Sequence, residues 1–359
     1  MAKRYLIIKL RHHGDVLLTT PVVEALKRHE PDCIIDVVIY QETRDMLAAH
    51  PDISVIHTID RQWKKQGLKS QLQHEWALLR EVQKRRYDTV VCLADQWRAA
   101  LLAKVSGASK RIGIAYPYRK NLAWQQCFTD LVPELDATHH IVEQNLLALQ
   151  PLGLSHAQSE RVPLKMTYHG EDWQKVVSLL EQQGWQEEDY VVVHPGSRWF
   201  FKCWDDDKTT AIVQKLLQQG QTVVLSAAPD ERELSMLQNI QQGLSQPFSG
   251  RLMVLAGVMN LRQLGALIAH ASLFIGVDSV PMHMAAATQT PCVALFGPTF
   301  MQRWRPWSDL ASVVYAGDFG PLPHPNSIDV NTSERYLSAI TVDAVWQAIE
   351  TQTSSKESQ

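Results

Sequence analysis

An aspartate near the start of the chain stands where it could act as a catalytic base. Asp15 comes directly after Gly14, which permits a sharp turn, and before an apolar segment that reads as a helix. A carboxylate held at the end of a strand could take a proton from a substrate hydroxyl. An aspartate beside a helix start is also typical of a simple N-cap. His12 and His13 could be bases, phosphate contacts or solvated loop side chains.

A second segment, past the middle of the chain, combines donors suited to a phosphate. It reads H-P-G-S-R-W-F-F-K-C-W over residues 194–204 and follows a predicted strand. The amide of Gly196 and the hydroxyl of Ser197 could donate to a diphosphate, while Lys202 supplies a positive charge and Arg198 lies in the same loop. The spacing is not that of a Walker A loop. A turn with an incidental lysine is the alternative.

A third segment, residues 276–287, also passes from a predicted strand to a predicted helix. Pro281 fits the first turn of that helix. Asp278, Ser279 and the free amides of the helix start would form an anion site, and His283 could project toward the same ligand. Capping by Asp278 or Ser279 alone is the structural alternative.

The acidic run at residues 205–207 suggests a metal site at first sight. Carboxylates in the first turn of a helix, however, normally complement the helix dipole. We therefore predict no metal site and no cofactor.

The elements that must position these loops alternate in type along the chain. Short segments that are apolar throughout, rather than alternating, are typical of parallel strands covered on both faces. The predicted strands are Tyr5–Leu10, Ile34–Tyr40, Val55–Ile59, Thr89–Ala94, Arg111–Ala115, Tyr190–His194, Thr222–Ala227, Leu252–Leu255, Leu273–Val277 and Cys292–Phe296. Amphipathic helices fill most of the gaps, and Asn260 with Gln263 predicts a capping box at the start of one of them. The pattern predicts an α/β fold with doubly wound sheets.

The chain length of 359 residues favours two domains. The pattern lapses near residues 153–172, which we interpret as a linker. We expect one domain over residues 1–165, a second over 170–350 that ends in a helix at Val342–Ile349, and a disordered polar tail at 351–359. Two such domains that face each other would leave a central cleft between them. Ligands of open α/β sheets bind outside the carboxyl ends of the strands, so we expect the ligands in this cleft.

Composition restricts the class of protein. A net charge of -3 gives no overall attraction to nucleic acid. No signal peptide or membrane-spanning stretch is visible, so we expect a cytoplasmic protein. The five cysteines are scattered and suit buried thiols rather than disulfides or zinc: Cys33, Cys92, Cys127, Cys203 and Cys292.

Together the three loops resemble the motif set of the lipopolysaccharide core heptosyltransferases, which are inverting transferases of the GT-B fold with two Rossmann-like domains. The resemblance covers nearly the whole chain. It rests on Gly14-Asp15-Val16-Leu17 with Thr20-Pro21, on His194-Pro195-Gly196-Ser197 with Lys202 and Trp204, and on Asp278-Ser279 with His283. The opening motif and the H-P-G-S form are most similar to members that add the third, side-branch heptose.

The resemblance implies a role for each matching position. It places the catalytic base at Asp15 and the lysine that binds the donor diphosphate at Lys202. It places Glu231 near the ribose hydroxyls and Met259 near adenine. Val280 stands where the family usually has glycine, and a β-branched residue is less free to adopt positive φ there.

The resemblance also implies the substrates, ADP-heptose as donor and a phosphorylated lipopolysaccharide core as acceptor, with peripheral contact to the inner membrane. Basic residues of the first half could face that membrane or could be solvated helix faces: Lys64, Lys65, Lys69, Lys84, Arg85, Arg86, Lys110, Arg111, Arg119 and Lys120. Two other readings stay open. One is a nicotinamide-dependent oxidoreductase, although no G-x-G-x-x-G follows a predicted strand. The other is a non-catalytic ADP-sugar-binding protein.

Overall fold

The computed structural model describes residues 2–154, 161–245, 248 and 250–357. The chain forms two compact units, Met1–Met166 and Thr167–Gln359, which we describe one at a time. Among the described residues, no helix is both long enough and apolar enough to cross a bilayer.

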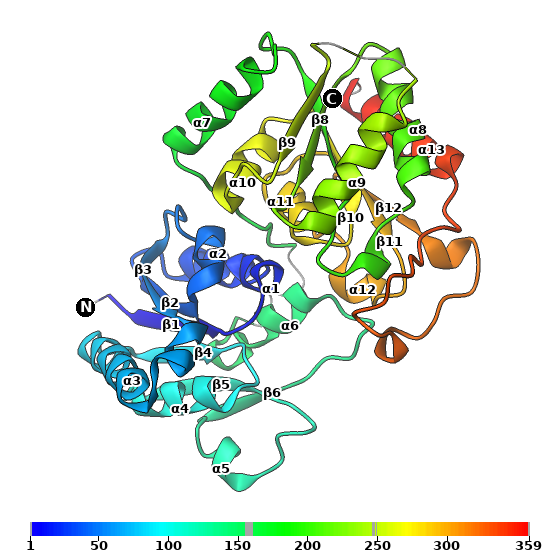
Figure 1. Cartoon of the computed structure of the whole chain (residues 1–359). Helices are drawn as coiled ribbons and strands as arrows, with labels where there is room; N and C mark the ends of the chain where they lie inside the picture. The colour runs from blue at the N-terminus through cyan, green and yellow to red at the C-terminus, as the bar shows by residue number, and fades with distance from the viewer. Residues whose placement is uncertain (1, 155–160, 246–247, 249, 358–359) are drawn as a thin grey trace. The chain divides into compact units, whose positions relative to one another are not determined.

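The described part of the first unit contains a parallel sheet in the order β3-β2-β1-β4-β5-β6 (Figure 1). Its strands are β1 (Arg4–Lys9), β2 (Ile34–Tyr40), β3 (Ile53–Ile59), β4 (Thr89–Cys92), β5 (Lys110–Ala115) and β6 (Asp130–Pro133). The sheet lies between helices, with α2 on the opposite side from α3 and α4 (Figure 1). The helices are α1 (His13–Leu17), α2 (Thr20–His29), η1 (Gln41–Met46), η2 (Arg61–Gln66), α3 (Leu68–Lys84), α4 (Trp97–Val105), α5 (Leu122–Gln125), α6 (Ile141–Leu147) and η3 (Gln150–Leu152).

Burial on both faces explains why the strands of this sheet are apolar throughout. Leu6 and Ile8 of β1 pack in one core cluster with Val82 of α3 and Ala99 of α4. Ile7 lies between them on the other face and is 1% exposed. Strand β1 is therefore central, and the loop that follows it opens at the middle of the sheet's carboxyl edge.

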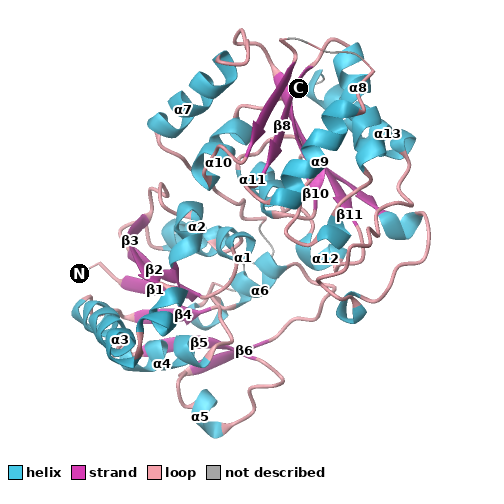
Figure 2. Ribbon diagram, in the orientation of Figure 1, coloured by secondary structure: helices cyan, strands magenta, loops and turns pink. Residues whose placement is uncertain are grey.

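The second unit repeats this architecture with a parallel sheet in the order β12-β11-β10-β7-β8-β9. Figure 2 shows β8, β10 and β11 of this sheet among its helices. Its strands are β7 (Tyr190–His194), β8 (Thr222–Ala227), β9 (Leu252–Ala256), β10 (Leu273–Val277), β11 (Cys292–Phe296) and β12 (Ala311–Tyr315). The helices are α7 (Gly170–Glu181), η5 (Phe200–Lys202), α8 (Asp206–Gln218), α9 (Glu231–Gln242), α10 (Leu261–Ala269), α11 (Val280–Ala287), α12 (Met301–Trp304), η6 (Ala316–Asp318), η7 (Pro325–Ser327) and α13 (Val342–Glu357). The strand order reverses between β7 and β10, so the loops after these two strands flank the point where such sheets bind ligands.

Most of the predicted elements are confirmed. All ten expected strands are present, all five cysteines are buried, and Asn260 and Gln263 form the expected capping box. The sequence pattern missed β6 and β12. Both are edge strands in which only one residue is buried, and β6 has only four residues and ends at Pro133, so neither shows the continuous apolar run of a central strand.

The expected disordered tail is wrong over residues 351–357. Helix α13 does not stop near Ile349 but continues to Glu357. The hydroxyl of Thr353 donates to the carbonyl of Ile349, and Nε2 of Gln352 donates to Ser312 at 2.7 Å, so polar side chains still find partners there. The predicted linker is irregular between η3 and α7 where it is described; residues 155–160 and 358–359 lie outside the described residues.

Candidate functional site

Asp15 lies in the first turn of α1, immediately after β1. The N-cap residue of this helix is His12, so Asp15 is not the cap that the sequence allowed. Asp15 is partly buried, while the next two residues, Val16 and Leu17, are fully buried and fix the helix against the core of the unit. Asp15 lies six residues beyond the end of a central strand and is not fully buried, which is compatible with the predicted role of general base.

Asp95, which follows β4, is a residue that the sequence reasoning missed. Its Oδ2 atom lies 2.9 Å from Nη2 of Arg11 and accepts from the hydroxyl of Tyr118 at 2.9 Å. Nε of Arg119 donates to the backbone carbonyl of Asp95 at 3.0 Å. Strands β1, β4 and β5 are neighbours, so Asp95 ties their carboxyl ends together. Its place directly after a predicted strand was the signal that could have identified it.

Lys202 of the second unit is buried and paired with an aspartate from a distant loop. Its Nζ atom lies 2.6 Å from Oδ2 of Asp278, which also accepts from the hydroxyl of Thr299 at 2.9 Å. Lys202 is 7% exposed and Asp278 is 4% exposed. The fold therefore brings together the loops after β7 and β10, each of which the sequence predicted to bind an anion.

Aromatic residues set the path of the loop that carries Lys202. Its ammonium lies 4.7 Å from the ring centroid of Trp199. Phe201 is buried against Tyr336, and the guanidinium of Arg335 lies 4.4 Å above the ring of Phe200. The two phenylalanines thus anchor the short helix η5 and direct Lys202 inward.

A buried polar network lies behind Gly196. A Cβ atom on Gly196 would come within 2.3 Å of Oε2 of Glu233, so any larger residue there would force the Glu233 side chain to move. That oxygen accepts from the amide of Ala228 at 2.9 Å and lies 3.8 Å from Nε2 of His194. Nδ1 of His194 lies 2.9 Å from the hydroxyl of Ser226. Burial lowers the pKa of His194 to about 4 and raises the pKa of Glu233, so the histidine is neutral near pH 7.

The third predicted loop leads into helix α11. Ser279 is its N-cap, but its side chain makes no capping bond, and within the described part of the chain its buried Oγ has no hydrogen-bond partner. Pro281 lies in the first turn, as expected, and His283 is buried there. Val280 opens the helix and is not among the residues with positive φ, so the missing glycine imposes no strain here.

The remaining predicted site residues lie at the same edge of this sheet but are not joined to the Lys202–Asp278 pair. Glu231 is the exposed first residue of α9, after β8. Met259 is partly buried in the loop after β9, and Arg198 is exposed. Among the described contacts, none of the three side chains bonds to Lys202 or Asp278.

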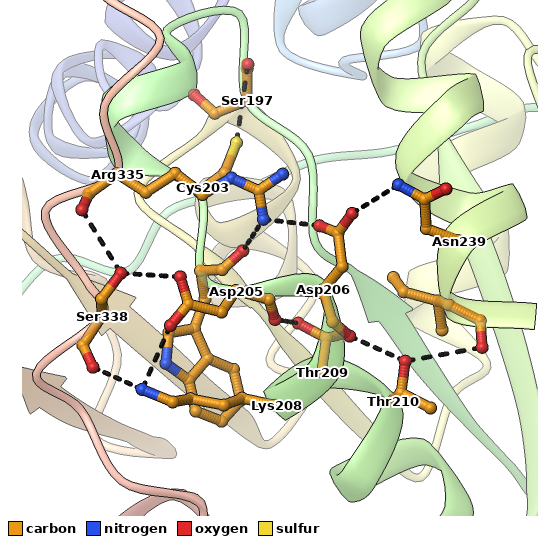
Figure 3. A network of polar contacts seen from close by, with 12 residues as sticks. Ser197, Cys203, Asp205, Asp206, Lys208, Thr209, Thr210, Asn239, Arg335 and Ser338 are labelled. Atoms are coloured by element: carbon orange, nitrogen blue, oxygen red, sulfur yellow. Dashed lines mark hydrogen bonds and ion pairs between the residues drawn. The ribbon is translucent and has the colours of Figure 1, made fainter. Parts of the chain in front are cut away.

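The acidic run begins at the N-cap of helix α8, and neighbouring donors bind the carboxylates of Asp205 and Asp206 (Figure 3). Asp205 accepts from the hydroxyl of Ser338 at 2.6 Å and pairs with Lys208 at 3.1 Å. Asp206 pairs with Nη1 of Arg335 at 2.5 Å and accepts from Asn239 at 2.8 Å. Asp205 and Asp206 thus hold the segment before α13 in place. Their carboxylate oxygens, which a metal ion would need as ligands, already bind donors of the protein.

A second cluster of metal-ligand type lies in the first unit, where Glu24, His50 and Asp52 converge. Nζ of Lys165 lies 3.1 Å from Glu24 and 3.2 Å from Asp52, so one ammonium already pairs with both carboxylates. Burial lowers the pKa of His50 to about 4. We interpret this cluster as an ion-pair network.

Comparison with known proteins identifies the family of this chain. The family described as glycosyltransferase family 9 (heptosyltransferase) matches residues 75–332. The lipopolysaccharide heptosyltransferase 3 of Escherichia coli strain K12 is 38% identical over 342 residues, which cover 95% of each chain. This chain belongs to glycosyltransferase family 9. As a member of that family it is a glycosyltransferase, and neither the oxidoreductase reading nor the non-catalytic one is supported.

Solved structures agree on the fold. A family 9 glycosyl transferase from Veillonella parvula DSM 2008 superposes with a TM-score of 0.82 at 23% identity, covering 98% of this chain and 97% of the other. The E. coli ADP-heptose lps heptosyltransferase II gives a TM-score of 0.75 at 21% identity and covers 99% of both chains. The two sheets of this chain are therefore the Rossmann-like units of a GT-B fold.

Proposed function

We propose that this glycosyltransferase moves a heptose from ADP-heptose to a heptose of the lipopolysaccharide inner core, with inversion, and that it adds the third, side-branch heptose. One observation carries the proposal: the 38% identity to a protein named lipopolysaccharide heptosyltransferase 3 extends over 95% of both chains. The pairing of Lys202 with Asp278 supports it, because a buried cation at the reversal of strand order suits a diphosphate.

The second unit holds the donor in this proposal. Lys202 and Ser197 bind the diphosphate, and the amides at the start of α11, with Ser279, Val280 and His283, stabilise the charge that grows on ADP. Asp278 holds the ammonium of Lys202 at the ligand.

The more exposed residues of the same sheet edge complete the donor site. Glu231 binds the ribose hydroxyls, Met259 contacts adenine, and Arg198 binds the donor.

The first unit holds the acceptor. Asp15 takes the proton from an acceptor hydroxyl, whose oxygen attacks the anomeric carbon as the bond from that carbon to the ADP oxygen breaks. ADP leaves with the electron pair, and the configuration inverts in one displacement. Arg11 and Arg119, which converge on Asp95, suit the phosphate groups of the acceptor.

We also propose that the protein works in the cytoplasm at the inner membrane, as a peripheral protein. The support is chemical, because the proposed acceptor is a phosphorylated glycolipid embedded in that membrane.

Mass spectrometry of the products tests the proposal. The protein is incubated with ADP-heptose and a panel of truncated lipopolysaccharide cores, and we expect one heptose to be added to a core that lacks only the side branch. Asp15→Asn and Lys202→Ala should each lower kcat at least about a hundredfold. Lys208→Ala, which removes a lysine that pairs with Asp205 and not with Asp278, should transfer normally. Lack of transfer to every core, or normal turnover by Asp15→Asn, would contradict the proposal.

A further inference from the structure

Helix α3 carries a stripe of large apolar side chains that its own unit does not bury. Leu68, Leu72 and Trp76 are 80%, 58% and 62% exposed. They recur every four residues and therefore share one face of the helix. No residue of α3 before Leu78 is buried, so the first part of this helix contributes little to the core. Packing within the unit does not account for these apolar residues, and contiguous exposed apolar surface marks an interaction site.

The stripe continues into an apolar groove that residues of α3 and α4 line. These two helices lie at the edge of the unit (Figure 2). The groove has a volume of about 480 Å³. Leu79 lines it from α3, and Leu101, which is 52% exposed, lines it from α4. Leu79 is seven residues after Leu72 and so lies on the same side of the helix. Stripe and groove form one apolar surface.

Basic residues border this surface. Residues 61–84 contain six lysines and arginines and two glutamates, a net charge of +4 in a chain whose total is -3. Lys64, Lys65 and Lys69 are exposed, and no ion pair involves them within the described ranges. The stacking of Trp63 on His74, with centroids 4.9 Å apart, fixes the segment that carries Lys64 and Lys65 against α3.

The two glutamates do not cancel this charge at the stripe. Glu75 pairs with Arg98 of α4. Glu81 lies on the last turn of α3, beyond the apolar stripe. The guanidinium of Arg80 lies 5.9 Å from the ring of Trp76, so a further cation stands beside the stripe.

We propose that Leu68, Leu72, Trp76 and the neighbouring lysines form a docking surface for an anionic lipid bilayer. The lysines approach the phosphate groups, and the leucines and the tryptophan enter the boundary between headgroups and acyl chains, as in other interfacial amphipathic helices. The inference rests on the proposed function in one respect, namely that a membrane glycolipid is the acceptor. It would hold the enzyme at the surface that contains its substrate.

Vesicle sedimentation of the full-length protein, without any sugar substrate, tests the surface directly. We expect binding to phosphatidylcholine vesicles that contain a quarter phosphatidylglycerol, and much weaker binding to pure phosphatidylcholine. Leu68→Ser/Leu72→Ser/Trp76→Ser should lower the partition coefficient at least about tenfold. Lys64→Gln/Lys65→Gln/Lys69→Gln should lower it by about fivefold per lysine and weaken its salt dependence.

A matched control removes apolar side chains that are exposed elsewhere. Phe319 and Val330 are 42% and 50% exposed in the second unit, and Phe319→Ser/Val330→Ser should bind vesicles as the wild type does. All variants should keep the wild-type urea midpoint, because the altered side chains are exposed. Equal binding by wild type and stripe variant, or equal binding to neutral and anionic vesicles, would overturn the proposal. So would a wild-type dimer that the stripe variant converts to a monomer, since the surface would then be a protein interface.

A transfer assay separates this inference from the proposed function. With a lipid-free core oligosaccharide the stripe variant should match the wild type, whereas with the acceptor in anionic vesicles it should be slower by about the loss in partition. Equal loss with both acceptors would overturn the docking role. Absence of transfer by the wild type to either acceptor, with vesicle binding intact, would reject the proposed function alone.

Discussion

The ammonium of Lys202 lies 2.6 Å from the carboxylate of Asp278, although the two residues belong to different strand-to-helix loops. Both side chains are buried, so each charge depends on the other. The pair fixes a cation at the carboxyl edge of the sheet before any ligand arrives.

Removing one member of this pair should cost more stability than removing both charges. Lys202→Met leaves the Asp278 carboxylate buried without its cation, and we expect a loss of about 3–5 kcal/mol in the free energy of unfolding. Lys202→Met/Asp278→Asn should regain at least half of that loss in urea denaturation, because the introduced asparagine keeps an acceptor for Thr299. Transfer activity should stay absent in both variants.

The control for that cycle is Lys208→Met, which breaks the partly exposed Lys208–Asp205 pair. We expect it to cost about 1 kcal/mol or less. A double variant that is less stable than Lys202→Met would show that the buried pair stabilises the fold by itself.

Gly196→Ala should destabilise the loop after β7. The new Cβ would meet the carboxyl group of Glu233, which is 6% exposed and would have to leave its hydrogen bond from the amide of Ala228 in order to move. We expect a loss of about 1–3 kcal/mol and a higher KM for the donor. Gly196→Ala/Glu233→Ala should relieve the clash and regain stability.

Gly170→Ala is the matched control, since no atom lies within 4 Å of the position that its new methyl group would occupy. It should leave the urea midpoint unchanged or slightly raised. A Gly196→Ala protein as stable as this control would contradict the close contact with Glu233.

The buried His194 should make stability depend on pH. Its pKa is lowered from 6.5 to about 4, so between these values the unfolded chain binds a proton that the folded chain does not. Stability from this group therefore falls as pH decreases from 6.5 toward 4, by about 1.4 kcal/mol per pH unit at most. His50 contributes with the same sign, and Glu233, whose pKa is raised, with the opposite sign.

Comparison with His194→Gln isolates this histidine. The variant should be less stable than the wild type at pH 7, and the difference should shrink by about 1 kcal/mol between pH 6 and pH 5. Urea denaturation at each pH measures it, and parallel curves for the two proteins would contradict a neutral, buried His194.

The acidic run should act as an anchor and not as a metal site. Asp206→Ala removes the partner of Arg335 and Asn239, and we expect a loss of about 1.5–3 kcal/mol. Asp207→Ala, at an exposed neighbour in the same helix turn, should cost about 0.3–1 kcal/mol. Millimolar magnesium or EDTA should leave the unfolding midpoint of the wild type unchanged; a clear rise with magnesium would point to a bound ion instead.

The sequence alone determined the fold class, ten of the twelve described strands and the three loops, because each is a local pattern. Continuous apolar runs predict buried parallel strands, and glycine, serine or proline at the end of a run predicts a strand-to-helix turn. The reliance on local patterns also explains why β6, β12 and the last turns of α13 were not predicted. Edge strands β6 and β12 are only half covered, so their residues need not be apolar, and the hydrogen bonds that extend α13 to Glu357 include one from Gln352 to a distant serine, Ser312.

The tertiary structure decided which of the predicted groups meet. Asp95 meets Arg11 and Tyr118 only because β1, β4 and β5 are adjacent in the sheet, and Glu233 lies behind Gly196 only because α9 packs there. Likewise, the acidic run is an anchor because Arg335 and Ser338, far along the chain, are folded against it. These contacts depend on strand order and packing between distant segments, which no pattern of neighbouring residues contains.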